Sequence, residues 1–86
     1  MDDLTQEVCK VVSEALIDAK SVEALSNPID GSSSMDSIAE WDSLSFVNVF
    51  MAVSEHFEVD VDQDDAIQFT SIEGIVELLN EIRETA

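Results

Sequence analysis

The chain has few of the residues from which disulfides, membrane spans and cysteine metal clusters are built. Cys9 is its only cysteine, so an internal disulfide and a cysteine metal cluster are excluded, which fits a reducing cytoplasm. No apolar run is long enough to span a bilayer, and residues 1–3 carry acid where a secretory signal would carry base. We therefore expect a soluble, unprocessed cytoplasmic protein in which Cys9 packs inside a helix bundle.

Basic residues are equally scarce. Lys10, Lys20 and Arg83 stand against 20 aspartates and glutamates, for a formal net charge of -17. Nucleic acid and anionic membranes repel such a chain, so the expected partners are proteins with basic faces. Its 86 residues suffice for one modest core but not for a deep active site, and the single histidine, His56, has no nucleophile pattern near it. We expect a monomer that is not an enzyme.

The spacing of apolar residues predicts an all-α fold, a four-helix bundle with three long helices, one short helix and a long first loop. The expected single domain over 1–86 contains a helix over 3–19, a loop over 20–42, a helix over 43–57, an acidic loop with a short helix over 58–69, and a helix over 71–84. Apolar residues in the long loop, Trp41 among them, should anchor it to the helices. Thr70 and Glu73 are placed as the N-cap of the last helix and its reciprocal partner.

The predicted helix over 43–57 has two apolar stripes when its residues are placed at about 100° each. One is aromatic and is the natural core face: Phe46, Phe50, Val53 and Phe57. The other is aliphatic and lies on a different side: Leu44, Val47 and Met51. The spacing leaves two explanations open for the aliphatic stripe, since it can face a neighbouring helix or form an exposed docking strip.

Asp42, Ser43 and Leu44 stand at the boundary between the long loop and this helix. The plain interpretation of Ser43 is a capping serine that contributes about 1 kcal/mol. The same position suits a phosphate ester, because free backbone N–H groups and the positive end of the helix dipole favour negative charge there. A second Asp-Ser-aliphatic triplet, around Ser37, has no amphipathic run directly after it, so we interpret Ser37 as a loop serine.

With Val47, Met51 and Glu55, this segment resembles the attachment motif and second helix of the acyl carrier protein family. The resemblance covers most of the chain and implies a carrier rather than a catalyst. It implies that a phosphopantetheinyl transferase moves 4'-phosphopantetheine from coenzyme A onto Ser43, with Asp42 as a magnesium contact during the transfer. The thiol of the arm then carries acyl cargo as a thioester between biosynthetic enzymes.

The same resemblance implies a docking role for the aliphatic stripe. Leu44, Val47 and Met51, with Glu55 at their edge, become partner-binding residues. The implied partners are the transferase and the acyl-loading, condensing or transferring enzymes, each with a basic docking face. Apolar contact with charge at its rim favours fast and weak encounters, which suit a carrier that visits several enzymes.

The resemblance to carriers of fatty acid biosynthesis is incomplete. Those carriers usually have glutamates where this chain has Asn48 and Ser54, and a small residue where it has Trp41. A tryptophan at that place is more typical of carriers in specialised or aminoacyl pathways. We therefore predict a carrier of a specialised pathway, such as polyketide biosynthesis, with a peptidyl or aminoacyl carrier as the alternative.

Two other functions remain open. Asp60, Asp62 and Asp64 alternate as in a calcium-binding loop, which is the basis for an acidic calcium-binding protein. The loop lacks the glycine and the final bidentate glutamate of an EF-hand, so we expect weak, unselective divalent binding and no dedicated metal site. A carrier-like domain without its cofactor would serve only as an interaction module, and the presence of Ser43 speaks against it.

Overall fold

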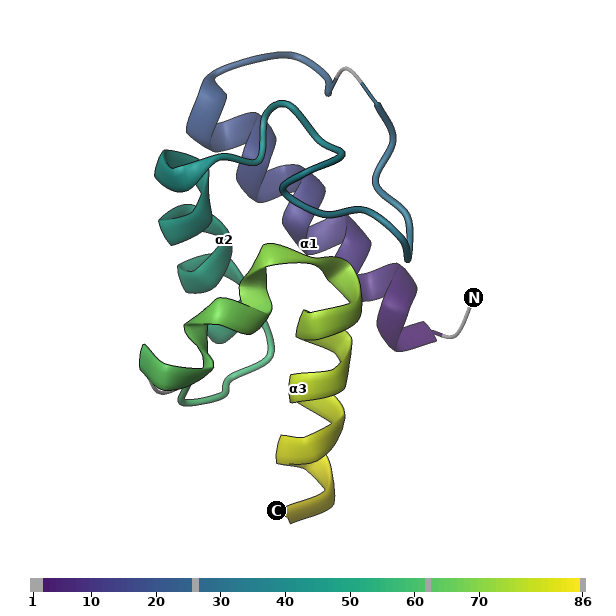
Figure 1. Cartoon of the computed structure of the whole chain (residues 1–86), viewed down its shortest axis with the longest axis vertical. Coiled ribbons are helices and arrows are strands. Elements are labelled where there is room, and N and C mark those ends of the chain that lie inside the picture. Colours follow the sequence, from purple (N-terminus) through teal and green to yellow (C-terminus); the bar gives the residue numbers. More distant parts are fainter. Residues whose placement is uncertain (1–2, 26, 62, 86) are drawn as a thin grey trace.

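The computed structural model describes residues 3–25, 27–61 and 63–85, and all of its regular elements are helices. They are α1 (Asp3–Lys20), α2 (Ser43–His56), the 3-10 helix η1 (Gln63–Thr70) and α3 (Ile72–Thr85). Within these ranges, the β contacts are limited to one isolated bridge between Ser34 and Ser71. The predicted all-α bundle, with three long helices, one short helix and a long first loop, is confirmed (Figure 1).

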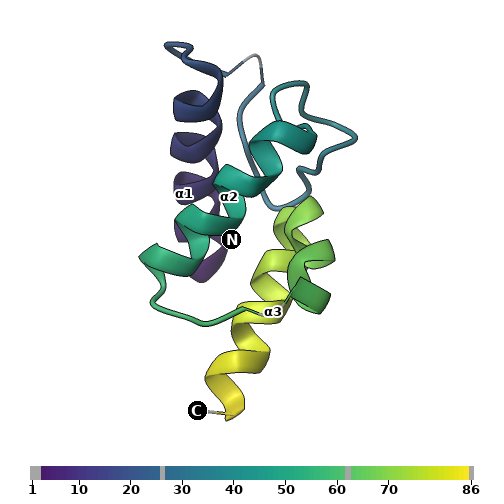
Figure 2. The ribbon, with the colours of Figure 1, turned by 90° about the vertical axis from the view of Figure 1, so that its left-hand side faces the viewer.

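The four helices are arranged so that α1 and α2 pack together, while α3 packs against α1 and η1. Figure 1 shows the long loop between α1 and α2 crossing one end of the bundle. Figure 2 shows the last turns of α3 projecting beyond the rest of the molecule at the other end. None of the helices in the described ranges combines the length and the apolar character that a membrane crossing requires.

α1 is amphipathic because its apolar residues recur every three or four positions. Asp3 in its first turn and Lys20 in its last turn place charges where they suit the helix dipole. Cys9 is buried on this helix, and burial raises the pKa of its thiol, as expected for a packing residue rather than a reactive one. The buried face is formed by Val8, Cys9, Val11, Val12, Ala15 and Leu16.

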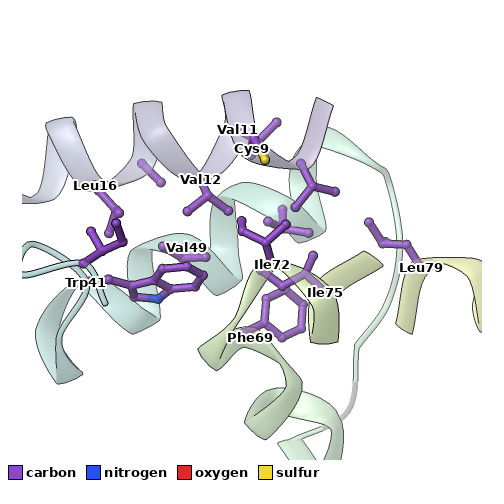
Figure 3. Packing of buried hydrophobic residues seen from close by; sticks show 14 of the residues in the cluster. Cys9, Val11, Val12, Leu16, Trp41, Val49, Phe69, Ile72, Ile75 and Leu79 are labelled. Carbon is purple, nitrogen blue, oxygen red and sulfur yellow. The ribbon is translucent and has the colours of Figure 1, made fainter. Parts of the chain in front are cut away.

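The core includes two aromatic residues that come from outside the three long helices (Figure 3). Trp41 comes from the end of the long loop and is 1% exposed, and Phe69 comes from η1 and is fully buried. In Figure 3 the Trp41 ring lies near Leu16 of α1 and Val49 of α2. Ile38 of the loop is buried with them. The long loop is therefore a part of the core, as its apolar residues indicated.

The buried face of α2 differs from the predicted one. The residues of this helix that are buried are Ser45, Val49 and Val53. The three phenylalanines expected there are only partly buried at the flank of the core: Phe46, Phe50 and Phe57. On a helical wheel the buried line is rotated by about 70° from the centre of the aromatic stripe. The prediction was wrong about the centre of the face because Ser45 is polar, yet its hydroxyl is buried and donates to the carbonyl of Glu40 at 2.7 Å.

The cap of α3 also differs from the predicted one. Ser71 is the N-cap, because its Oγ accepts the N–H of Gly74 at 3.0 Å. The Thr70 hydroxyl instead donates back to a carbonyl of η1, so the predicted pairing of Thr70 with Glu73 is wrong. Glycine is required at position 74, since a Cβ there would lie 2.4 Å from the carbonyl oxygen of Gln68.

Two backbone hydrogen bonds tie the middle of the long loop to the start of α3. The N–H of Met35 donates to the carbonyl of Thr70 at 2.9 Å, and the N–H of Ile72 donates to the carbonyl of Ser33 at 3.0 Å. The end of the loop is held by the buried Trp41. The chain therefore enters α2 from a fixed direction.

The orientation of α2 predicts which of its residues matter most for stability. We expect Val49→Ala to lower the free energy of unfolding by about 2 kcal/mol, because it removes two methyl groups from a fully buried site. Met51→Ala should lower it by less than about 1 kcal/mol, since Met51 is 54% exposed. Chemical denaturation of both variants measures the two values. A larger loss from Met51→Ala than from Val49→Ala would contradict this orientation.

Candidate functional site

Asp42 caps α2. Its backbone is extended, with φ -121° and ψ -172°, and its Oδ1 accepts the N–H groups of Leu44 and Ser45, both at 3.0 Å. An N-cap side chain satisfies backbone donors that have no partner within the first helical turn. The capping role considered for Ser43 therefore belongs to Asp42, and Ser43 is the first residue of the helix. The cap also occupies amides that were expected to support a phosphate.

Ser43 is exposed at the first position of α2. In the part of the chain that the structure describes, no hydrogen bond uses its hydroxyl. Ser37 differs, because its Oγ accepts the N–H of Ser34 at 2.9 Å and lies 3.2 Å from the Ser34 carbonyl, to which it donates. The Ser37 hydroxyl closes a turn in the loop, whereas Ser43 is exposed and its hydroxyl has no such role among the described residues.

A lysine from the far side of the long loop pairs with the cap. Lys20, the last residue of α1, donates from Nζ to Oδ2 of Asp42 at 2.5 Å. This hydrogen bond, followed by the one from the backbone N–H of Ser45, lowers the pKa of Asp42 to about 2. The pair joins the end of α1 to the start of α2 over a sequence separation of 22, so the sequence carried no signal for it.

Two residues near Ser43 are buried, Trp41 two positions before it and Ser45 two positions after it. The Trp41 ring lies in the core, and the Ser45 hydroxyl is bonded to the Glu40 carbonyl. The indole N–H of Trp41 has no hydrogen-bond partner among the described residues, so apolar packing alone holds the ring. Buried side chains two positions before and two positions after Ser43 thus hold the backbone that carries it. Sequence reasoning missed Ser45, whose only signal is its position one turn before Val49.

The aliphatic stripe of α2 faces solvent. Leu44 is 82% exposed, Val47 55% and Met51 54%, and Glu55, one turn further along, is also exposed. Packing against a neighbouring helix, one of the two explanations left open, does not account for these side chains. A row of exposed apolar side chains is typical of a contact surface. We call Leu44, Val47 and Met51 the aliphatic strip.

A groove between α1 and α2 borders the aliphatic strip. Its volume is about 500 Å³, and its lining includes Glu14 and Asp18 of α1 and Asn48 and Met51 of α2. The Nδ2 of Asn48 donates to the carbonyl of Ala15 at 2.7 Å. Asn48 therefore joins the two helices, and the acids give the groove a negative rim.

The acidic segment before η1 was the basis for the calcium-binding alternative. Of its three alternating aspartates, Asp62 and the side chain of Asp64 lie outside the described residues, and only Asp60 is fully described. Among the described residues, no group of three or more potential ligands could hold a metal ion. The calcium-binding alternative gains no support from the described part of this segment.

The lowered pKa of Asp42 makes a pH prediction. A carboxylate with a folded-state pKa of about 2, against the ordinary 3.8, contributes stability that is fully present above the ordinary value and is lost as the pH falls through the folded value. The difference in unfolding free energy between the native protein and Asp42→Asn should be constant above about pH 5 and shrink between about pH 4 and pH 2. Denaturation over this range measures it. A difference that stays constant down to about pH 2 would show that the folded protein does not favour the ionised form.

Residues 3–79 of the chain, which contain Ser43 and most of the four helices, match a known protein family. The family is described as a phosphopantetheine attachment site. No curated protein and no solved structure matches the chain. Since the family match covers well over half of the 86 residues, the chain belongs to the phosphopantetheine attachment site family, which bears 4'-phosphopantetheine as its prosthetic group, as acyl carrier proteins do.

Proposed function

We propose that this protein holds acyl or related cargo as a thioester on a 4'-phosphopantetheine arm at Ser43 and carries it between the enzymes of a specialised pathway. The observation that supports this proposal is the exposed Ser43 hydroxyl directly after an aspartate cap, in a chain of the phosphopantetheine attachment family. The protein supplies the attachment point, and its partner enzymes supply the catalysis. Aminoacyl or peptidyl cargo is the alternative, and the intact mass of the loaded protein from its host distinguishes the two.

The residues around Ser43 fit this prosthetic group. The hydroxyl is exposed and used by no hydrogen bond among the described residues, so an ester can be added without disturbing the core. The positive end of the α2 dipole and the ammonium of Lys20 favour the negative charge of a phosphate. The group, when bound, supplies a thiol that holds the cargo and raises its effective concentration at each partner.

Ser43 is the nucleophile of the proposed attachment reaction. Its Oγ bonds to the phosphorus next to pantetheine in coenzyme A, the pyrophosphate bond breaks and adenosine 3',5'-bisphosphate leaves. The hydroxyl proton passes to a base of the transferase. Asp42 is the residue that we expect to contact the magnesium ion of the transferase. Its Oδ1 holds the amides of α2, so Oδ2, which pairs with Lys20, is the oxygen that remains for this contact.

The aliphatic strip and Glu55 form the proposed docking surface. They lie on α2 with Ser43, so a partner that binds them also reaches the attachment point. The net charge of -17 attracts partners with basic faces, and the exposed apolar side chains supply the contact once they have met. The partners proposed are the phosphopantetheinyl transferase and the acyl-loading, condensing or transferring enzymes.

Ser43 should be the only serine that is modified. Incubation with coenzyme A, magnesium and a promiscuous transferase should add a single phosphopantetheine to the native protein and none to Ser43→Ala. Intact-mass and peptide mass spectrometry measure the addition. Ser37→Ala is the matched control, because Ser37 also follows an aspartate, and it should be modified like the native protein. Continued modification of Ser43→Ala would disprove the assignment.

Met51→Ala should slow attachment without unfolding the protein. Loss of an apolar contact at the centre of an interface typically weakens binding by about 1 kcal/mol or more, so kcat/KM of the transferase should fall at least about fivefold, mainly through KM. Ile67→Ala is the control, since Ile67 is 73% exposed on η1, outside the strip. Native kinetics for Met51→Ala, or equal slowing by Ile67→Ala, would rule out the strip as the docking surface.

A further inference from the structure

One of the few cations of this chain stands at the attachment site. Lys20 is one of only 3 lysines and arginines among 86 residues, and its ammonium lies 2.5 Å from Oδ2 of Asp42. A second polar contact joins the same two helices at the last residue of α2, where Nε2 of His56 lies 2.9 Å from Oε1 of Glu7. Lys20 therefore places a positive charge beside the residue that precedes Ser43.

Apart from Lys20 and the helix dipole, the described surroundings of Ser43 offer little to offset the charge of a phosphodiester. Phosphates at helix starts are usually held by free backbone N–H groups. Here the N–H groups of Leu44 and Ser45 donate to Oδ1 of Asp42, both at 3.0 Å. Asp42 is itself an anion one residue away, in a chain of net charge -17. The additional anion therefore needs a cation to offset the repulsion.

Lys20 is within reach of both anions. An ammonium has three donors on a flexible stem, and one of those of Lys20 is used by Asp42. Ser43 is the next residue, with its Cα about 3.8 Å from that of Asp42. We expect the flexible stem of the lysine to let its ammonium reach a phosphate on the Ser43 side chain. The Lys20 side chain is only 29% exposed, and partial burial weakens the screening of its charge by salt.

We propose that Lys20 is the counterion of the attached arm. Lys20 pairs with Asp42 before attachment and is shared between Asp42 and the phosphodiester afterwards, so it positions the root of the arm toward the end of α1. This inference rests on the proposed attachment at Ser43. The rate of attachment is not a clean test, because Lys20 also occupies the oxygen of Asp42 that the magnesium ion of the transferase would contact. Equilibrium measurements on the protein that already carries phosphopantetheine do not involve the transferase, so they report only the effect of Lys20 on the attached group.

The first measurement compares unfolding of the unmodified and modified proteins at low salt. Lys20→Gln should raise the unfolding equilibrium constant of the modified protein about two- to fivefold more than that of the unmodified protein, as expected for loss of a partly exposed ion pair. Lys10→Gln is the matched control, because it removes the same charge from another position of α1 and should affect both forms equally. Lys20→Arg should remove most of the extra destabilisation that Lys20→Gln causes in the modified protein, since it keeps the charge.

The second measurement is the ³¹P resonance of the modified protein, which contains a single phosphorus. The resonance should shift in Lys20→Gln and stay in place in Lys10→Gln. Raising the salt concentration to about 1 M should screen the Lys20 charge, so the ³¹P resonance of the modified native sequence should move toward the chemical shift found for Lys20→Gln. If Lys20→Gln lowers the stability of the modified and unmodified proteins equally and leaves the ³¹P resonance in place, the role of Lys20 as counterion is wrong, while the proposed function still stands. If peptide mass spectrometry finds no adduct on Ser43, the proposed function and this inference both fail.

Discussion

The geometry of the site depends on the contacts that the carboxylate of Asp42 makes. Its Oδ1 satisfies the first amides of α2, and its Oδ2 pairs with Lys20 at the end of α1. One side chain therefore sets where α2 begins and joins that point to the neighbouring helix. Because the aspartate is the cap, Ser43 becomes the first helical residue, and its oxygen is not needed by the backbone. A serine in the capping position would have its oxygen turned toward the helix amides and away from a partner.

The burial of Trp41 and Ser45 determines how α2 is rotated about its axis. The Ser45 hydroxyl is bonded to a loop carbonyl, and Val49 and Val53 continue the same buried line one and two turns later. At about 100° per residue, this rotation turns Ser43 and the aliphatic strip toward the opposite, exposed side of the helix. The attachment point and the proposed docking surface therefore share one face. A polar residue in the core is thus part of what orients the site.

Periodicity was sufficient to predict the helices, because an amphipathic pattern depends only on which residues avoid water. Periodicity failed where the burial or pairing of a residue depends on a partner elsewhere in the chain. Ser45 is buried because the loop brings it the carbonyl of Glu40, and Lys20 meets Asp42 only after the loop has folded. The error at the cap of α3 has a simpler cause, and the plain interpretation of Ser43 as a cap has the same one: at each helix start two adjacent residues can cap, and the backbone angles decide between them. The role of Ser43 rests on family resemblance and remains a prediction.

Two polar residues of α2 bear on which partners the proposed docking surface can serve. Asn48 and Ser54 stand where carriers of fatty acid biosynthesis usually have glutamates. Both are used inside the molecule: Nδ2 of Asn48 donates to the carbonyl of Ala15 at 2.7 Å, and Oγ of Ser54 donates to the carbonyl of Phe50 at 2.8 Å. Neither residue offers a charge to a partner, so this surface of α2 is less ionic than one with glutamates at both positions. Complementary charge speeds encounters and helps to select partners, so a surface with fewer charges relies more on the fit of its apolar contacts. Such a surface supports the proposal that the partners are a few dedicated enzymes.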